Sequence, residues 1–233
     1  MLKNTRSRIN RFMDNQYERD NWVTSQLSSL ANGSKILDAG CGSQRYRQFC
    51  EHLEYHAQDF AAYTTDEQGS FSGNKEMYQY GEIDYISDIW NINAEDNFFD
   101  VILCTEVFEH IPYPNETLYE FSRLLRSGGK LILTVPSNCL RHMDPYFFSS
   151  GYSDRYLEFF LDKYNFTNYK IISYGSYYKW MMVEIYRTMG INGLFAKLFL
   201  LPAMCFYYLK QKYNDQVAVN TLCFGYFVVA EKK

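Results

Sequence analysis

Two carboxylates and an imidazole stand close together in the segment Thr105-Glu106-Val107-Phe108-Glu109-His110-Ile111-Pro112. Glu106, Glu109 and His110 have the spacing i, i+3 and i+4, which would gather their side chains on one face of a helical turn. Together they could bind a divalent cation. They could equally act as a general base and its orienting group for a substrate hydroxyl, or serve a purely structural role.

A glycine-rich turn is the second candidate for chemistry, in the run Ile36-Leu37-Asp38-Ala39-Gly40-Cys41-Gly42, where it follows a short apolar strand. Because glycine lacks a Cβ, a flat ligand can lie against the main chain there. A helix predicted to begin near Arg45 would point its free N–H groups at the same place. Asp38, at the end of the strand, could hold a polar or cationic group of that ligand.

This turn resembles motif I of the class I S-adenosylmethionine-dependent methyltransferases, of the methyltransferase type 11-like group. Tyr55–Asp59 is similar to the second strand of that family and ends in an acid about 20 residues after the glycines, as a nucleotide-binding βαβ unit requires. Three further segments of the family are matched in order. Tyr85–Ile89 resembles the segment that reads adenine, Phe98–Cys104 resembles the fourth strand, and Leu124–Pro136 resembles the fifth strand with its preceding turn. The resemblance covers roughly residues 30 to 175.

One residue departs from the family pattern, because Gln44 stands where motif I often has a third glycine. The dinucleotide fingerprint of dehydrogenases wants glycine there so that helix and strand pack closely. Gln44 therefore argues against a dehydrogenase, and it leaves the shape of the turn open.

The resemblance implies a Rossmann-like α/β fold, with a seven-stranded, mostly parallel sheet, helices on both faces and a helical insertion before the last strand. It also implies S-adenosyl-L-methionine as the cofactor. The ribose hydroxyls would bind Asp59, and adenine would bind Asp88 with Ile89. The full set of cofactor-binding residues that the resemblance implies is Asp38, Ala39, Gly40, Gly42, Asp59, Phe60, Asp88, Ile89 and Thr105.

The Glu-x-x-Glu-His pattern is similar to that of two methyltransferase families, the ubiquinone-pathway O-methyltransferases and the small-RNA 2′-O-methyltransferases. In the second family a later histidine completes a metal site, and here that position would fall to His142. The resemblance thus implies Glu106, Glu109, His110 and His142 as ligands of magnesium, manganese or zinc. The alternative is metal-free catalysis, with His110 as the base and Glu109 as its aid.

The composition narrows the class of protein. The 233 residues are 47% hydrophobic and 21% charged, which suits one globular α/β domain over 1–233. The net charge of −4 gives no overall field that attracts nucleic acid. No pair of the six cysteines forms Cys-x-x-Cys, and the N-terminal residues have no apolar signal-peptide core, so we expect a cytoplasmic protein with reduced thiols.

The elements that must position these residues follow from apolar periodicity. It predicts helices over 14–30, 114–125 and 153–164, and strands over 168–174 and 221–230. The family normally joins its last two strands by a short hairpin. Residues 178–213 therefore form an insertion, predicted to be helical.

The most apolar part of that insertion is 194–209, which is too short to span a bilayer alone. It could pack on its own domain, close over the site as a lid, or form a homodimer contact. It could also rest on a membrane as an interfacial helix, flanked by lysines.

Taken together, the residues predict a methyltransferase that O-methylates a hydroxyl on a small molecule or on a sugar of a polysaccharide precursor. The alternatives are an RNA 2′-O-methyltransferase, a quinone-pathway methyltransferase and a non-catalytic subunit that binds the cofactor. The negative net charge disfavours RNA.

Overall fold

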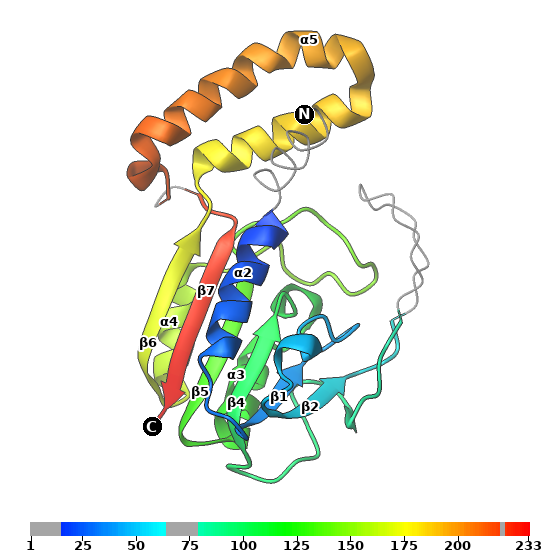
Figure 1. Cartoon of the computed structure of the whole chain (residues 1–233), viewed down its shortest axis with the longest axis vertical. Coiled ribbons are helices and arrows are strands. Elements are labelled where there is room, and N and C mark those ends of the chain that lie inside the picture. The colour runs from blue at the N-terminus through cyan, green and yellow to red at the C-terminus, as the bar shows by residue number, and fades with distance from the viewer. Residues whose placement is uncertain (1–14, 64–78, 220–221) are drawn as a thin grey trace. The chain divides into compact units, whose positions relative to one another are not determined.

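The computed structural model describes residues 15–63, 79–219 and 222–233. Its central feature is a seven-stranded sheet with the strand order β3-β2-β1-β4-β5-β7-β6 (Figure 1). The strands are β1 (Lys35–Ala39), β2 (Glu54–Asp59), β3 (Tyr85–Ile86), β4 (Phe99–Thr105), β5 (Leu125–Pro136), β6 (Phe166–Tyr174) and β7 (Gly225–Lys232). The predicted Rossmann-like sheet is confirmed.

Strands β1 to β5 run parallel. β1 pairs with both β2 and β4, β2 pairs with β3, and β4 pairs with β5. The arrow of β7 points the opposite way to that of β6, so the sheet is mixed (Figure 1). Because parallel strands end together, the residues that follow β1, β2, β3 and β4 meet at one edge of the sheet. This edge is called the carboxyl edge below.

Alternate residues of the central strands face two separate cores. On one side Ile102 and Cys104 of β4 join the buried face of α3 (Pro114–Leu124) and α4 (Asp154–Lys163). On the other side Val101 and Leu103 pack with α2 (Asn15–Ser28). Since both faces of the sheet are covered, β1, β4 and the second half of β5 read as apolar runs, which is why the sequence pattern located them.

Local signals set the ends of the helices. Pro114 occupies the first turn of α3, where its missing N–H costs nothing. The Ser153 side chain caps α4 by accepting a hydrogen bond from the Tyr156 N–H. The three predicted helices are confirmed to within a few residues. Asp14 and Thr221, the predicted first residues of a helix and of the last strand, lie outside the described residues.

The helix predicted from Arg45 is wrong. The structure has only a short 3₁₀ helix, η1 (Arg47–Phe49), after the glycine-rich turn. Gln44 has a φ of 55°, in the left-handed region. Gln44 itself therefore cannot belong to a right-handed helix, and the two residues after it continue the turn until η1 begins.

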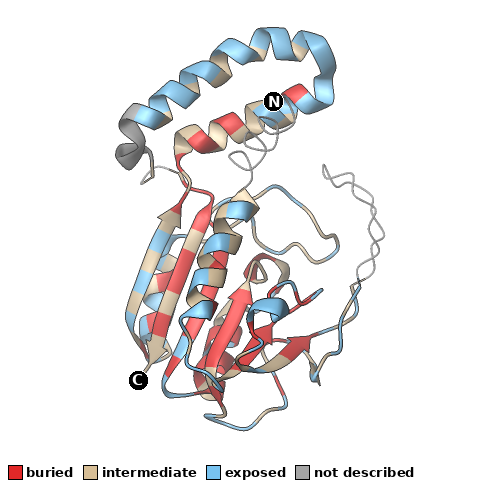
Figure 2. Cartoon of the chain, viewed as in Figure 1, coloured by how far each residue is buried: buried red, intermediate tan, exposed pale blue. Residues whose placement is uncertain are grey.

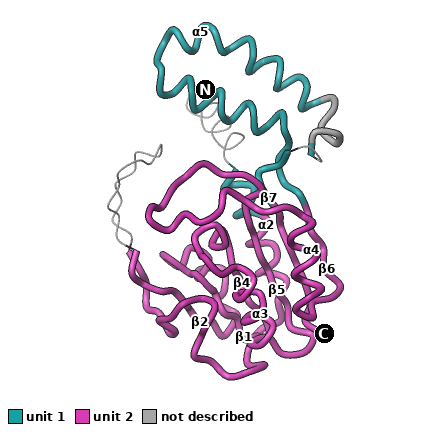
Figure 3. The backbone as a smooth tube through the Cα atoms, turned by 180° about the vertical axis from the view of Figure 1, so that it is seen from behind, with its two compact units in different colours: residues 1–21, 173–225 teal, residues 22–172, 226–233 magenta. Residues whose placement is uncertain are grey.

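The chain divides into two compact units (Figure 3). Residues 22–172 and 226–233 form one unit, which contains the strands of the carboxyl edge. Residues 1–21 and 173–225 form the other unit, and it contains the long helix α5 (Tyr177–Val219). The predicted insertion at 178–213 lies within α5 and is helical.

Candidate functional site

The turn after β1 is held to the end of β2 by hydrogen bonds that its main-chain N–H groups donate. Gly40 and Gly42 have φ values of 70° and 51°, which glycine adopts without strain. The Gly40 N–H donates to the Gln58 carbonyl oxygen at 2.9 Å. The Gly42 N–H donates to Oδ2 of Asp59, also at 2.9 Å. The turn is thereby fixed against the acid that follows from the second strand.

Gln44 fills its place in the turn in a way that the sequence pattern did not reveal. Its side chain is buried, and its amide nitrogen donates to the Glu82 carbonyl oxygen at 2.5 Å. Its amide oxygen accepts from the Arg47 guanidinium at 2.8 Å. A side chain thus links the glycine-rich turn to the segment that leads into β3, where a glycine could not.

Asp59 presents a carboxylate whose two oxygens are already oriented. Oδ2 accepts from the Gly42 N–H, and Oδ1 accepts from the Ala61 N–H at 3.0 Å. Burial raises the pKa of Asp59, and these backbone hydrogen bonds oppose the rise. A carboxylate has about four acceptor positions, so this one can still accept from two vicinal hydroxyls.

Asp38 is almost fully buried at the end of β1. Its Oδ2 accepts a hydrogen bond of 2.6 Å from the Tyr55 hydroxyl on the neighbouring β2. Burial raises the pKa of Asp38 to about 7, the Tyr55 hydrogen bond opposes the rise, and the charge of Asp59 adds to it. A cationic group placed beside Asp38 would favour the ionised form.

The other predicted cofactor residues lie along the same edge. Ala39 closes β1, Phe60 follows β2 with its ring 5.0 Å from that of Tyr146, and Thr105 closes β4. Asp88 and Ile89 follow β3, with Asp88 exposed and Ile89 buried. The structure thus brings the whole predicted set to the carboxyl edge.

The prediction that Glu106 shares a helix face with Glu109 and His110 is wrong. Glu106 has a left-handed φ of 53°, and only the short 3₁₀ helix η2 (Phe108–His110) follows it. The Glu106 carboxylate instead accepts a hydrogen bond of 3.0 Å from the Thr134 hydroxyl of β5. Because the backbone reverses at Glu106, the spacing that suggested one face does not apply.

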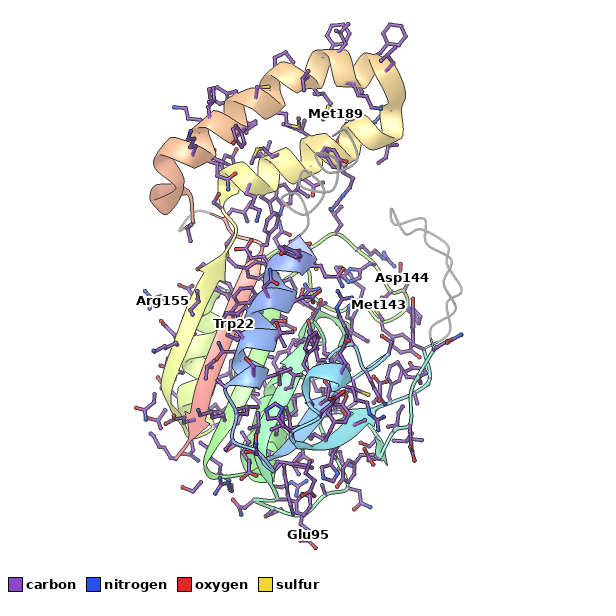
Figure 4. All side chains as sticks on the ribbon, viewed as in Figure 1. Trp22, Glu95, Met143, Asp144, Arg155 and Met189 are labelled. Carbon is purple, nitrogen blue, oxygen red and sulfur yellow. The ribbon has the colours of Figure 1, made fainter. Side chains whose placement is uncertain are left out.

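Glu109, His110 and His142 do come together. Each offers a ligand atom, and these atoms all lie within 4.8 Å of one another. Oε1 of Glu109 is 3.7 Å from Nε2 of His110, and the two imidazole rings meet edge to face with centroids 4.6 Å apart. His142 lies on the loop after β5, beside Met143 and Asp144, which are labelled in Figure 4.

Backbone carbonyls fix the tautomers of both histidines. Nδ1 of His110 is 2.6 Å from the Tyr146 oxygen, and Nδ1 of His142 is 2.8 Å from the Leu140 oxygen. A carbonyl only accepts, so each Nδ1 carries the proton and each neutral ring has its lone pair on Nε2. The pKa of His110 is lowered to about 4, mainly by burial and also by His142, and the Tyr146 contact opposes this change. The site therefore brings hydrogen-bond acceptors, the Nε2 atoms of the two histidines, close to the buried Glu109 carboxylate.

Two functional contacts were missed by sequence reasoning. The Glu109 carbonyl oxygen accepts from the N–H groups of Phe148 and Ser149, at 2.9 and 3.2 Å, which ties the loop after β5 to η2. The Tyr146 carbonyl orients His110. Both contacts use main-chain atoms, which every residue has, so no side-chain pattern could have indicated them.

Comparison with known proteins identifies the unit that carries this site. A family model described as a methyltransferase domain matches residues 37–133, from β1 to β5. The strand order, the glycine-rich turn and the acids at the carboxyl edge are those expected of the S-adenosylmethionine-dependent class. The chain carries a methyltransferase domain over these residues. Every predicted cofactor residue from Asp38 to Thr105 falls inside the matched range.

Curated relatives match this methyltransferase domain over part of their length. Ubiquinone biosynthesis O-methyltransferase of Xanthomonas oryzae pv. oryzae (strain PXO99A) is 30% identical over 119 residues, which cover 50% of this chain and 48% of that protein. Malonyl-[acyl-carrier protein] O-methyltransferase of Paenibacillus sp. (strain JDR-2) is 29% identical over 111 residues, covering 45% of this chain and 40% of that protein. The chain therefore matches less than half the length of these relatives.

Solved structures share the fold of the methyltransferase domain at low sequence identity. A SAM-dependent methyltransferase from Archaeoglobus fulgidus has a TM-score of 0.56 at 14% identity, covering 96% of this chain and 97% of the other. Haemonchus contortus phosphoethanolamine N-methyltransferase 2, in complex with S-adenosyl-L-methionine, has a TM-score of 0.53 at 14% identity, covering 93% and 52%. At such identities the likeness is one of fold.

Proposed function

We propose that this chain is an S-adenosylmethionine-dependent O-methyltransferase that acts on a hydroxyl of a small molecule or of a sugar in a polysaccharide precursor. The observation that carries the proposal is the convergence of Glu109 Oε1 and His110 Nε2, 3.7 Å apart, in the segment that directly follows β4 at the carboxyl edge. Two acceptors placed there can take the hydrogen of an incoming hydroxyl. The names of the two relatives, both O-methyltransferases, support the same type of reaction.

The residues at the carboxyl edge fit the cofactor. Asp59 would accept from the two ribose hydroxyls, and Asp88 would accept from the adenine amino group. Asp38 and the glycine-rich turn would hold the methionine end, whose ammonium group would favour ionised Asp38. When bound, S-adenosylmethionine supplies an electrophilic methyl group on a sulfonium centre.

His110 and Glu109 would prepare the acceptor. The lone pair on Nε2 of His110 would accept the proton of the acceptor hydroxyl, and the Glu109 carboxylate would stabilise the resulting imidazolium. The Tyr146 carbonyl holds the ring in the tautomer that this step needs. Loss of the proton strengthens the hydroxyl oxygen as a nucleophile for in-line attack.

As the alternative to this metal-free step, we propose that Glu109, His110 and His142 hold a divalent cation through the same atoms, and the cation would then lower the pKa of the acceptor hydroxyl in place of the base. The arrangement supports this in two ways. The three ligand atoms lie within 4.8 Å of one another. Each histidine also donates its Nδ1–H to a backbone carbonyl, as metal-binding histidines commonly do. Two nitrogens and one carboxylate favour manganese or zinc over magnesium, which prefers oxygen ligands.

A calorimetric titration with Mn²⁺ would test the cation site. Glu109→Gln should abolish the isotherm. Glu106→Gln is the matched control, because Glu106 is bonded to Thr134 and lies outside the group, so its isotherm should be unchanged. The absence of an isotherm in the unaltered chain would leave metal-free catalysis by the same residues.

Titration with S-adenosylhomocysteine would test the cofactor site. The unaltered chain should bind, and Asp59→Asn should weaken binding by about 10- to 100-fold, because two charge-assisted hydrogen bonds to ribose are lost. Asp96→Asn is the control, because Asp96 pairs with Arg123 in the described structure and contacts none of the cofactor residues. If the unaltered chain does not bind, the proposed function fails.

Methyl transfer itself would be measured with labelled cofactor on panels of sugar nucleotides and of catechols. Transfer to a sugar hydroxyl would support the preferred acceptor class. Transfer to a catechol would favour the quinone-pathway alternative, which the name of the Xanthomonas relative supports. Binding of the cofactor with no transfer to either panel would leave the non-catalytic subunit.

A further inference from the structure

Helix α5 folds back on itself to form a hairpin (Figure 1). Gly193, with a left-handed φ of 73°, lies between a first arm (177–192) and a second arm (194–219). The arms pack together, since the ring of Tyr207 lies 6.5 Å from that of Tyr177 and 6.3 Å from that of Tyr178. Met189 of the first arm is buried and lies between the arms (Figure 4).

The second arm has two apolar faces, and only one of them is covered. Its half-buried residues Ala196, Leu200, Ala203 and Tyr207 recur at helical spacing and form the face toward the first arm. The opposite side, called the outer face, is apolar and exposed (Figure 2). The residues of the outer face are 50% to 81% exposed, and they are Leu194, Phe195, Leu198, Phe199, Leu201 and Phe206.

By length and composition alone, α5 resembles a membrane segment. Between Tyr177 and Lys212 it is long and apolar enough to cross a bilayer, with a mean hydropathy of 1.6. Only 6% of its most apolar stretch is buried, however. A core helix of a soluble protein would be mostly buried, and a signal sequence would lie near the N-terminus. Neither description fits an exposed helix between β6 and β7.

The connections of α5 exclude a simple crossing. It follows β6 and leads into β7, and these two strands are neighbours in the sheet. A helix that crossed a bilayer once would place its two ends on opposite sides, which neighbouring strands do not allow. The hairpin returns the chain to the same side. Its first arm, 177–192, is also shorter than the about 20 residues that a crossing needs, so two crossings are disfavoured and a position within one interface fits the hairpin best.

Lysines border the outer face. At about 100° of rotation per residue, the outer face spans an arc of about 160°, and Lys197 and Lys210 fall just beyond its two edges. In this position their stems can lie along apolar chains while the ammonium groups reach lipid phosphates. The second arm has three lysines and one acidic residue, in a chain whose net charge is −4, whereas the two basic residues of the first arm are paired with carboxylates. Positive charge on α5 therefore lies mainly on the arm that carries the outer face.

We propose that the outer face of α5 docks into the interface of a lipid bilayer that contains anionic lipids, with the hairpin lying in the plane of the membrane. A second copy of the chain is a poorer occupant for two reasons. The six side chains of the outer face offer no hydrogen-bonding group to specify a protein partner. A two-fold contact would also bring the bordering lysines of two copies together. The proposal does not depend on the methyl-transfer reaction.

Vesicle flotation of the full chain tests the proposal, with vesicles of phosphatidylcholine alone or mixed with phosphatidylglycerol. The unaltered chain should float with both and more strongly with the mixture. Phe195→Glu/Leu198→Glu should lower the bound fraction by at least about tenfold, because two charges would enter the apolar layer. The matched control is Tyr119→Glu/Phe159→Glu, which changes residues of α3 and α4 that are 60% and 63% exposed, and it should bind as the unaltered chain does.

Lys197→Gln/Lys210→Gln separates the two sources of affinity for the vesicles, which are burial of apolar side chains and attraction to anionic lipids. It should reduce binding to the mixed vesicles toward the level seen with phosphatidylcholine, because only the electrostatic attraction is removed. An unchanged preference for the mixture would contradict the proposed role of these lysines. A circular dichroism spectrum and a urea-unfolding midpoint equal to those of the unaltered chain would establish that each variant is folded.

Cys205 gives a measurement that needs no substitution. It is exposed on the second arm, at a position whose helical angle falls within the outer face. Its reaction with a water-soluble maleimide should slow several-fold when mixed vesicles are present. An unchanged rate, or failure of the unaltered chain to float, would overturn the proposal. So would a dimer in solution that Phe195→Glu/Leu198→Glu dissociates, because the outer face would then belong to a second copy.

Discussion

The imidazole rings of His110 and His142 meet edge to face with their centroids 4.6 Å apart, and each ring is oriented by a different backbone carbonyl. His110 belongs to η2, directly after β4, whereas His142 lies on the loop after β5. Because β4 and β5 are neighbouring parallel strands, the segments after them emerge side by side. The candidate site is thus assembled from two distant segments by the pairing of two strands.

Replacing His142 should separate cation binding from cofactor binding. His142→Ala removes one nitrogen ligand and leaves the carboxyl edge intact. We expect the affinity for Mn²⁺ to fall by at least about 100-fold, because loss of a direct ligand should cost more than loss of a residue that only hydrogen-bonds to a ligand. The affinity for S-adenosylhomocysteine should change little. Calorimetry measures both. His56→Ala, which removes a histidine that pairs with Glu54 instead, should change neither affinity.

The raised pKa of Asp38 predicts opposite effects on stability and on binding. The folded chain keeps a proton on Asp38 up to about pH 7, whereas the ordinary value is 3.8. Between these values the folded state binds the proton that the unfolded state has released, so the free energy of unfolding falls as pH rises through this window. Above this pH window, the ionised buried carboxylate lowers the free energy of unfolding by on the order of 4 kcal/mol relative to an exposed carboxylate.

Asp38→Asn removes that cost and still offers an oxygen to the Tyr55 hydroxyl. In urea unfolding its gain in stability over the unaltered chain should grow from pH 4 to pH 7 and then level off. Its affinity for S-adenosylmethionine should be weaker and lose most of its pH dependence, because no carboxylate faces the cationic cofactor. An equal gain at both ends of this range would mean that Asp38 does not titrate as proposed.

The strands and the acids at their ends could be predicted because buried parallel strands are apolar along their whole length. Asp38 interrupts such a run near its end, so its place at the carboxyl edge followed from the pattern, whereas β2 is largely polar and Asp59 was placed by the family resemblance. Glu106 could not be placed this way. Its left-handed φ depends on the path between β4 and η2, and a glutamate carries no sign of that conformation.

The hairpin in α5 was also beyond the sequence pattern. Apolar residues on every side of a segment indicate a helix without saying which side is covered. The fold at Gly193 divides those residues into a half-buried and an exposed face. Gly190 and Gly193 lie in the segment where the chain folds back, but glycine is also tolerated inside helices, at a cost of about 1 kcal/mol.

Substitution of Gly40 should destabilise the methyltransferase domain by two separable effects. A Cβ at Gly40 would lie 2.6 Å from a methyl group of Val107, and the left-handed φ of 70° disfavours any other residue. We expect Gly40→Ala to lower the free energy of unfolding by about 3 kcal/mol, from left-handed strain and overpacking together. Gly128→Ala is the matched control, since its φ of 74° imposes the same strain with nothing within 4 Å.

The difference between these variants isolates the contact with Val107. Gly128→Ala should cost only about 1 to 2 kcal/mol. Val107→Ala should restore part of the stability that Gly40→Ala loses, because it removes the methyl groups that the new Cβ meets. Equal losses in Gly40→Ala and Gly128→Ala would mean that the loop shifts to accommodate the Cβ. Urea unfolding monitored by circular dichroism measures each value.

Gln44 provides the last test, because its side chain stabilises the fold through hydrogen bonds whereas its left-handed backbone destabilises it. Gln44→Ala keeps the left-handed strain and loses the hydrogen bonds to the Glu82 carbonyl and the Arg47 guanidinium, so we expect a loss of about 2 kcal/mol. Gln44→Gly loses the same hydrogen bonds but relieves the strain, and should be about 1 kcal/mol more stable than Gln44→Ala. Both should weaken binding of S-adenosylhomocysteine, because the segment that leads to Asp88 would lose its link to the glycine-rich turn. Calorimetric affinities equal to that of the unaltered chain would mean that this link does not position the residues proposed to bind adenine.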